Sequence, residues 1–403
     1  MKKFIITGIQ MRNKGSQAMF LSLYSGLKAI YPDCEVIGFA NKYDAPEQYK
    51  FKLLPYDDFT RLVFRHNLQK IPFAVPLLTR LAGARRKTDK WDGAVREMVK
   101  ALREADAIFD ASGYTLGSGW SQEAGGMLLQ TIRIAKQYNK KIFLMPQSFG
   151  PFDWNEPDTE AFLKEVKHEL SYATKIYPRE KEGYESLTAL GLTNVELSTD
   201  MVIREKAFPE PEDILVPSRI GEVEYPEPNS VGFIINENVF RIGDSGAVLN
   251  LYVQLLNKLV ASGENAYFLT TSTADINLVE EVLSRIDDRS KVKIISGEYA
   301  SPELIDIISK FKYVVASRYH SVVFAFRRGV PAIILGWANK YIDLAEHFQQ
   351  QDYVFDIRNP GVDQIFEKID KMSANHDAES QTIKGCLADL QATSVIEDAV
   401  KLL

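Results

Sequence analysis

The sequence predicts an α/β protein made of two Rossmann-like domains that face a cleft. Short apolar runs alternate with amphipathic stretches along the chain, which is typical of sheets whose strands are joined by helices. One Pro-rich acidic segment, residues 206–229, separates two such blocks of similar size. The 403 residues fit two large domains or three smaller ones at ~150 residues each. We therefore expect ligands at the carboxyl ends of the strands, where the loops of open α/β sheets begin.

The first domain is expected over residues 1–205. Its first strand is predicted at Phe4–Ile9, a mainly apolar run, and a helix follows over Ser16–Ile30, where apolar residues recur at helical spacing. Further strands are predicted at Glu35–Ala40, Ala107–Ala111, Lys141–Met145, Lys175–Tyr177 and Val195–Leu197. Further helices are predicted at Trp91–Glu104, Glu123–Tyr138, Thr159–Tyr172 and Lys181–Leu190.

The second domain is expected over residues 230–372, with residues 373–403 as C-terminal helices. Its strands are predicted at Val231–Ile235, Ala266–Thr271, Val292–Ile295, Tyr313–Ala316 and Ala332–Leu335. Helices between them are predicted at Ala247–Ser262, Asp275–Ile286, Pro302–Lys310 and Ser321–Arg328. The part from Val362 onward predicts two helices, of which one is a candidate to cross back to the first domain.

Composition excludes several classes of protein. Hydrophobic residues make up 45% and charged residues 25%, which excludes intrinsic disorder. The net charge is −6, from 48 basic and 54 acidic residues, so a nucleic-acid partner is not expected. Two cysteines, Cys34 and Cys386, exclude a disulfide scaffold and a Cys-based metal site. With no signal peptide and no long apolar run in the sequence, we expect a cytoplasmic protein.

Polar side chains follow three strands of the first domain. The turn after Phe4–Ile9 has amide and hydroxyl groups suited to sugar hydroxyls, and Ser16 there is a candidate helix N-cap. The Gly-rich loop after Ala107–Ala111 carries Tyr114 and Trp120, whose rings can stack on a sugar. The candidates for binding a sugar, which would be the acceptor if the protein transfers a group, are Asn13, Ser16, Gln17, Ser112, Tyr114, Gln147 and Ser148.

Two strand-end arginines are candidates for binding an anion. Arg179 directly follows the strand Lys175–Tyr177 at the start of a helix, where the helix dipole favours negative charge. A surface pair with a neighbouring glutamate is the alternative. Arg318 lies in Ser317–Ser321, between a strand and a helix, and His320 beside it can exchange protons near neutral pH.

Other chemistry is not supported by the sequence. The remaining histidines have no partner at a metal-ligand spacing, so a metal site is not supported. No G-x-S-x-G motif occurs, which disfavours a serine hydrolase.

The segment Ser317-Arg318-Tyr319-His320-Ser321, followed by Gly329-Val330-Pro331 and Lys340, resembles the C-terminal signature of the polysaccharide pyruvyl transferases. The resemblance extends to Asn13-x-Gly15, to Gln147-Ser148-x-Gly150-Pro151 and to Arg179. It implies a fold similar to GT-B glycosyltransferases. It also implies phosphoenolpyruvate as the donor and transfer of pyruvate, as a ketal, onto two hydroxyls of one sugar.

The resemblance assigns the donor-binding residues as Arg179, Arg318, Ser317, Tyr319 and Lys340, and His320 as the catalytic residue. Two alternatives remain open. One is a GT-B-type glycosyltransferase that uses a nucleotide sugar, with Glu303 as a weak candidate for binding the ribose. The other is a non-catalytic carbohydrate-binding relative.

Residues 71–90 combine apolar residues with Arg80, Arg85, Arg86, Lys87 and Lys90. Basic clusters beside apolar surface favour anionic membranes. If the acceptor is lipid-linked, this stretch would hold the protein at the inner leaflet of the membrane; the alternative is an insertion packed on the first domain.

Overall fold

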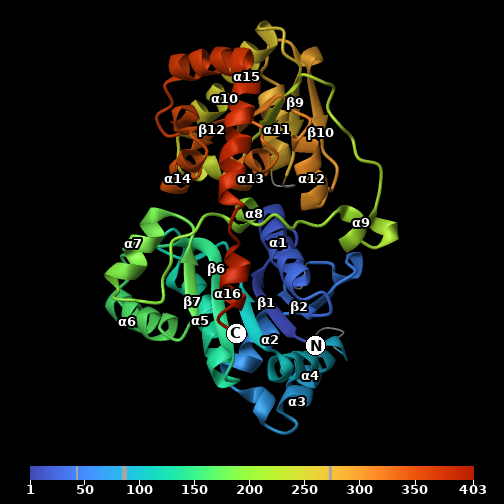
Figure 1. Ribbon diagram of the computed structural model, residues 1–403, viewed down its shortest axis with the longest axis vertical. Helices are drawn as coiled ribbons and strands as arrows, with labels where there is room; N and C mark the ends of the chain where they lie inside the picture. The colour runs from blue at the N-terminus through green and yellow to red at the C-terminus, as the bar shows by residue number, and fades with distance from the viewer. Residues whose placement is uncertain (42–43, 84–88, 272–274) are drawn as a thin grey trace. The chain divides into compact units, whose positions relative to one another are not determined.

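The computed structural model describes residues 1–41, 44–83, 89–271 and 275–403, and the chain forms two compact units (Figure 1). The first unit consists of Met1–Met201, Ala207–Ile220 and Val395–Leu403, and the second of Val202–Lys206 and Gly221–Ser394. Each has its own hydrophobic core. This confirms the predicted α/β class with two Rossmann-like domains. Part of the predicted membrane stretch, residues 84–88, lies outside the described residues.

The first unit is built on a parallel sheet with the strand order β3-β2-β1-β4-β6-β5, and β7 also pairs with β6. The strands are β1 Lys3–Ile9, β2 Glu35–Ala40, β3 Lys52–Pro55, β4 Ala107–Asp110, β5 Tyr114–Leu116, β6 Lys141–Phe149 and β7 Lys175–Pro178. The helices are α1 Lys14–Ile30, α2 Asp58–Arg65, α3 Ala74–Gly83, α4 Asp89–Glu104, α5 Gln122–Gln137, α6 Thr159–Leu170, α7 Lys181–Ala189, α9 Pro211–Ile214 and α16 Val395–Val400. Most strand residues are buried, as expected for a parallel sheet covered on both faces.

The second unit has a six-stranded parallel sheet with the order β10-β9-β8-β11-β12-β13. Its strands are β8 Val231–Ile234, β9 Ala266–Leu269, β10 Val292–Ile295, β11 Tyr313–Ala316, β12 Ala332–Gly336 and β13 Val354–Asp356. Its helices are α10 Ser245–Ala261, α11 Ile276–Leu283, α12 Ser301–Ile308, α13 Tyr319–Arg327, α14 Asn339–His347 and α15 Val362–Leu390, and α8 is the short helix Met201–Arg204. Among the described residues, no helix is long and apolar enough to cross a membrane.

The structure differs from the expected boundaries in several places. Residues 207–220, expected as linker, pack in the first unit, where Lys50 donates to the carbonyl oxygen of Ile214 (2.8 Å). The predicted strand Val195–Leu197 forms only a single bridge, between Ile176 and Val195, because β7 ends at Pro178, which has no N–H to extend the ladder. Three short strands and five helices were not expected: β3, β5, β13, α2, α3, α8, α9 and α14.

The segments 202–206 and 391–394 lie where the chain passes between the units, and they are hydrogen-bonded to each other. The side-chain amide of Gln391 donates to the carbonyl oxygen of Ile203 (2.9 Å). Arg327 ends α13 and donates to the carbonyl oxygens of Val202, Glu205 and Lys206. Burial lowers the pKa of Arg327 to about 10, so it remains charged at neutral pH.

Gly8 interrupts the regular register of β1 and brings it close to the end of β4. Its φ is +74°, and a Cβ there would overlap Ser112 Oγ and lie 2.7 Å from the Ser112 backbone nitrogen. The register of β1 against β2 shifts between Ile6 and Ile9, as in a bulge beside a functional site. Only glycine allows this approach.

We predict that Gly8→Ala lowers the free energy of unfolding by roughly 2 kcal/mol or more, through backbone strain and overlap with Ser112. Gly126→Ala is the matched control, because Gly126 lies inside α5 with no atom within 4 Å of an added Cβ. That change should raise stability by about 1 kcal/mol. Urea unfolding of both variants measures the difference, and a neutral Gly8 variant would contradict the steric account.

Candidate functional site

The expected site residues lie at the reversal points of strand order in the two sheets. Strand order reverses between β1 and β4 in the first unit and between β8 and β11 in the second. Open parallel sheets bind ligands in the crevice outside the strand ends at such points. The Asn13 turn follows β1, Ser112 follows β4, and Ser317 follows β11. The structure thus shows two clusters of polar residues, one in each unit.

Asp110 at the end of β4 organises the first cluster. It is buried, and its carboxylate accepts hydrogen bonds from Thr7 Oγ1 (2.8 Å), from Ser112 Oγ (2.5 Å) and N, and from Gln147 Nε2 (3.3 Å). These donors satisfy the oxygens of a carboxylate that is buried away from water. The Oε1 atom of Gln147 is buried and has no donor among the described residues.

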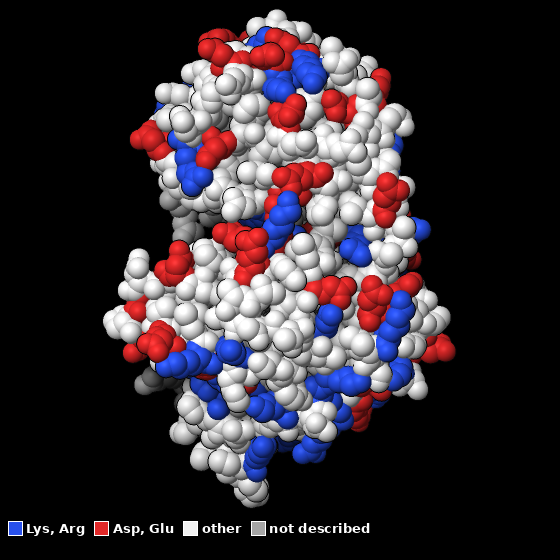
Figure 2. All heavy atoms as spheres, turned by 60° about the vertical axis from the view of Figure 1, so that its left-hand side comes forward, with Lys and Arg blue, Asp and Glu red and all other residues white. Residues whose placement is uncertain are grey.

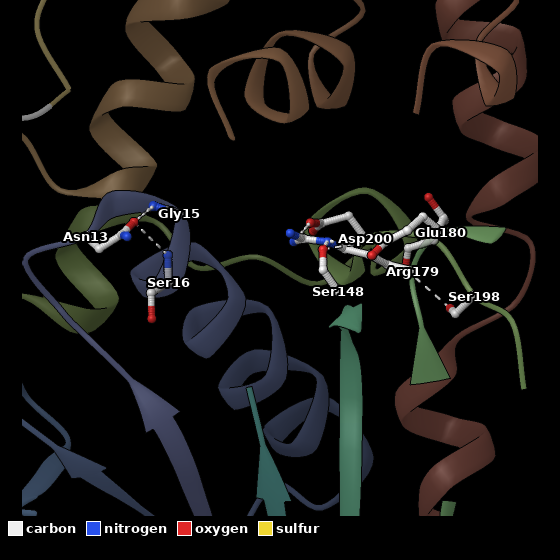
Figure 3. A network of polar contacts seen from close by, with 9 residues as sticks. Asn13, Gly15, Ser16, Ser148, Arg179, Glu180, Ser198 and Asp200 are labelled. Carbon is white, nitrogen blue, oxygen red and sulfur yellow. Dashed lines mark hydrogen bonds and ion pairs between the residues drawn. The ribbon is translucent and has the colours of Figure 1, made fainter. Parts of the chain in front are cut away.

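The turn after β1 is held by Asn13, which caps α1. Its Oδ1 accepts from the backbone N–H groups of Gly15 (3.1 Å) and Ser16 (3.3 Å), as Figure 3 shows. The expectation that Ser16 is the N-cap is therefore wrong, and Ser16 Oγ accepts from the backbone N–H of Gln10 instead (2.9 Å). Gln17 is fully buried and donates to the Tyr49 hydroxyl (2.8 Å), so it supports the packing of α1.

The Gly-rich loop wraps around the ring of Tyr114. A Cβ on Gly117 or Gly119 would lie 2.7 or 2.6 Å from the Tyr114 hydroxyl oxygen. This hydroxyl donates to the carbonyl oxygen of Gly150 (3.1 Å) and accepts from the Gly119 N–H (3.1 Å). Burial raises its pKa, so the hydroxyl stays protonated. Trp120 is 46% exposed and offers an open ring.

Arg179 lies in a buried network of charges and hydroxyls at the ends of β6 and β7 (Figure 3). Its guanidinium is only 3% exposed and pairs with Asp200 at 2.9 Å, while its Nε donates to Ser148 Oγ (3.1 Å). Glu180 lies 3.6 Å from the same Nε and accepts from Ser148 Oγ (3.2 Å). Arg179 is thus engaged by two carboxylates of its own unit, those of Glu180 and Asp200.

Ser317 in the second unit is fixed by two buried tyrosines. The Tyr252 hydroxyl donates to Ser317 Oγ (2.9 Å), and the Tyr341 hydroxyl donates to the carbonyl oxygen of Ser317 (3.0 Å). Burial raises the pKa of Tyr252 far above its ordinary value, so its hydroxyl remains a donor. The turn between β11 and α13 is therefore rigid before any ligand arrives.

Arg318, Tyr319 and His320 occupy the start of α13. The helix begins at Tyr319, with Arg318 as its N-cap residue, and not at Ser321 as expected. Arg318 is 24% exposed and pairs through Nη2 with buried Asp275, whose other oxygen accepts from the Glu237 backbone N–H (3.0 Å). Asp275 therefore orients the guanidinium while part of it stays accessible.

The ring of Tyr319 contacts two basic side chains, those of His320 and Lys340. Its ring lies edge-on to the His320 imidazole, with centroids 5.4 Å apart. Lys340 Nζ lies 5.4 Å from the Tyr319 centroid and 5.8 Å from that of Tyr341. The start of a helix adds backbone N–H groups and a positive field. This arrangement is suited to binding an anion.

Several residues of the two clusters were not found from the sequence. They are Thr7, Asp110, Glu180 and Asp200 in the first unit, and Tyr252, Asp275 and Tyr341 in the second. The position of Asp110 at a strand end was a usable signal, because its carboxylate comes directly after an apolar run. Glu180 was expected only as a surface partner of Arg179, and the other five residues act through partners distant in the sequence or buried in a core, for which no local pattern exists.

The structure also bears on cofactors and on nucleotide binding. Among the described residues, no group of three or more His, Cys, Asp or Glu side chains could hold a metal ion. Glu303, the candidate ribose ligand, is buried and accepts a hydrogen bond from the Ala300 backbone N–H (2.6 Å), which caps α12. That interaction gives Glu303 a structural role.

The sequence model of the polysaccharide pyruvyl transferase family matches residues 13–339. No curated protein matches the chain. Solved structures with a similar fold include S. aureus MnaA in its structure with UDP (TM-score 0.57, 10% identity, 95% of this chain and 91% of that chain). They also include the UDP-GlcNAc 2-epimerase of Methanocaldococcus jannaschii (TM-score 0.53, 12% identity, 92% of this chain and 92% of that chain). A third is the spinosyn rhamnosyltransferase SpnG (TM-score 0.53, 12% identity, 100% of this chain and 99% of that chain). These likenesses establish a GT-B-like fold.

We predict that Arg179→Ala lowers the free energy of unfolding by about 3–5 kcal/mol, because it leaves Asp200 buried without its cation. Arg358→Ala is the matched control: Arg358 pairs with Asp356 on the surface, with exposures of 54% and 44%, and should cost less than about 1 kcal/mol. Urea unfolding measures both. Equal effects of the two changes would contradict a structural role for Arg179.

Proposed function

The chain belongs to the polysaccharide pyruvyl transferase family, and on that premise we propose that it uses phosphoenolpyruvate. In this proposal the pyruvyl unit is transferred to two hydroxyls of one sugar, forming a ketal and releasing phosphate. The acceptor is a polysaccharide or its lipid-linked precursor, which the enzyme meets at the inner membrane leaflet. One observation carries the proposal: at the start of α13, Tyr319 contacts His320 and Lys340, and Arg318 directly precedes it as the N-cap residue.

Charge supports the assignment of donor and acceptor to different units. Phosphoenolpyruvate carries a phosphate and a carboxylate, which require several cations at close range. The second unit offers Arg318 and Lys340, with Asp275 as the acidic partner of Arg318. The first unit places a single arginine among Asp110, Glu180 and Asp200, a setting that suits neutral hydroxyls better than an anion. We therefore propose a positioning role for Arg179, since its guanidinium is already engaged.

The acceptor is proposed to bind beside the Asp110 cluster. Gln147 Oε1 is a buried acceptor to which a sugar hydroxyl can donate. Ser112 shares the Asp110 carboxylate with Gln147, and Ser148 follows Gln147 in the chain. Asn13 and Ser16 hold the neighbouring turn in place. Trp120 offers an exposed ring for stacking.

The proposed reaction balances without a cofactor. His320 donates a proton to the methylene carbon of phosphoenolpyruvate, which gives the adjacent carbon oxocarbenium character. One sugar hydroxyl attacks that carbon, phosphate leaves with its bonding electrons, and the second hydroxyl closes the ketal. One of the two hydroxyl protons returns to His320 and replaces the proton that His320 gave to the methylene carbon. The other hydroxyl proton leaves with the phosphate.

We expect phosphoenolpyruvate to raise the thermal stability of the wild type, by roughly 2.7 kcal/mol at ~100 times its dissociation constant. Arg318→Ala should abolish the shift, because the oriented guanidinium is gone. Arg285→Ala, a surface arginine on the same unit that pairs with Glu281, should keep it. A shift with a uridine-diphosphate sugar alone would replace this proposal with the glycosyltransferase alternative.

We expect His320→Ala to lower turnover by about 10²–10⁴-fold, the typical contribution of one general acid. The measurement is phosphate release from phosphoenolpyruvate in the presence of acceptor, with circular dichroism to verify the fold. His168→Ala is the control, since His168 lies on α6 beside Lys136 and belongs to neither cluster. Near-normal turnover of the His320 variant would exclude the role of acid.

A further inference from the structure

Helix α3 exposes an apolar face. Its inward residues, Val75 and Thr79, are buried, and Val75 packs against Val63 and Val95. On the opposite face, Phe73, Leu77 and Leu81 are 81%, 58% and 64% exposed, and their four-residue spacing aligns them along the helix. Ile71, just before the helix, is 54% exposed. We call Ile71, Phe73, Leu77 and Leu81 the α3 ridge.

The backbone at the start of α3 holds Phe73 outward. Phe73 has a φ of +62°, in the left-handed region that bulky residues rarely occupy. This conformation costs roughly 1 kcal/mol or more. A large ring is thus kept in solvent, next to three other exposed apolar side chains.

The segment that carries the ridge is basic. Residues 59–81 contain Arg61, Arg65, Lys70 and Arg80 but no Asp or Glu, although the whole chain has a net charge of −6. Arg65, Lys70 and Arg80 are exposed, and none of them forms an ion pair within the described part of the chain. Figure 2 shows Lys and Arg side chains gathering toward the lower end of the view, the end at which Figure 1 places α3.

We propose that the α3 ridge binds the surface of an anionic lipid bilayer. The apolar side chains would enter the boundary between headgroups and acyl chains, and Lys70 and Arg80 would lie against lipid phosphates. Charge favours a bilayer over a second copy of the chain. In a symmetric dimer formed through this face, Arg65, Lys70 and Arg80 of one copy would lie near the same basic residues of the other copy. Residues 59–81 contain no acidic side chain that could offset this repulsion.

Membrane binding through the α3 ridge would bring the protein to a lipid-linked acceptor. Only this link to the acceptor rests on the proposed function. Figure 1 shows α3 at the end of the first unit away from α1, whose start carries the Asn13 turn. Binding through α3 would therefore leave the strand-end turns of this unit uncovered. Vesicle binding needs neither donor nor acceptor, so it can succeed or fail independently of pyruvyl transfer.

The test is sedimentation of the full chain with vesicles of phosphatidylcholine alone or with added phosphatidylglycerol. We expect binding only to the anionic vesicles, weakened by salt. Phe73→Ser/Leu77→Ser/Leu81→Ser should abolish it, because each apolar side chain contributes about tenfold or more. Lys70→Ser/Arg80→Ser should weaken binding about 25-fold, or roughly fivefold per charge.

Matched controls change residues of the same kind elsewhere. Leu402→Ser removes an exposed leucine (45%), and Arg285→Ser/Arg289→Ser removes two exposed arginines; all should bind like the wild type. Circular dichroism verifies the fold of each variant. Absence of binding, equal binding to both vesicle types, or a dimer that Phe73→Ser dissociates would overturn the proposal.

Discussion

The structure depends on one constraint: a charge removed from water must be paired. At the strand ends of the first unit, Asp110 is stabilised by neutral donors and Asp200 by the Arg179 guanidinium. In the second unit, buried Asp275 is compensated by Arg318. Ion pairs of this kind contribute little net stability compared with apolar packing, but losing one partner is costly. Their value here is geometric, because they fix polar groups before a ligand binds.

The two clusters have opposite electrostatic character. Carboxylates outnumber the single arginine in the first, whereas the second combines cations with the positive end of a helix. Under the proposed function, such a division would separate a hydroxylated ligand from an anionic one. The loops that follow the strands carry this difference, while the two sheets share one parallel architecture.

The sequence was sufficient to predict the α/β class, because buried parallel strands such as Val231–Ile234 are nearly continuous apolar runs. Short edge strands such as Val354–Asp356 were not predicted, since three residues carry little periodic signal. Arg318 and His320 were identified from their local motif. Asp275, the partner of Arg318, was not identified from the sequence. The two residues are 43 positions apart and become neighbours only when β9 and β11 share a sheet.

The hydrogen bonds of Arg327 have a mechanical consequence. Helix α13 carries Tyr319 and His320 at one end and, at the other, the arginine that holds the carbonyl groups of segment 202–206. A helix of nine residues is a rigid rod ~13 Å long, so its two ends move together. Arg327 therefore ties the carboxyl end of α13 to segment 202–206, and the Ser317 contacts fix the turn before its first residue, so the helix that carries His320 is anchored at both ends within the second unit.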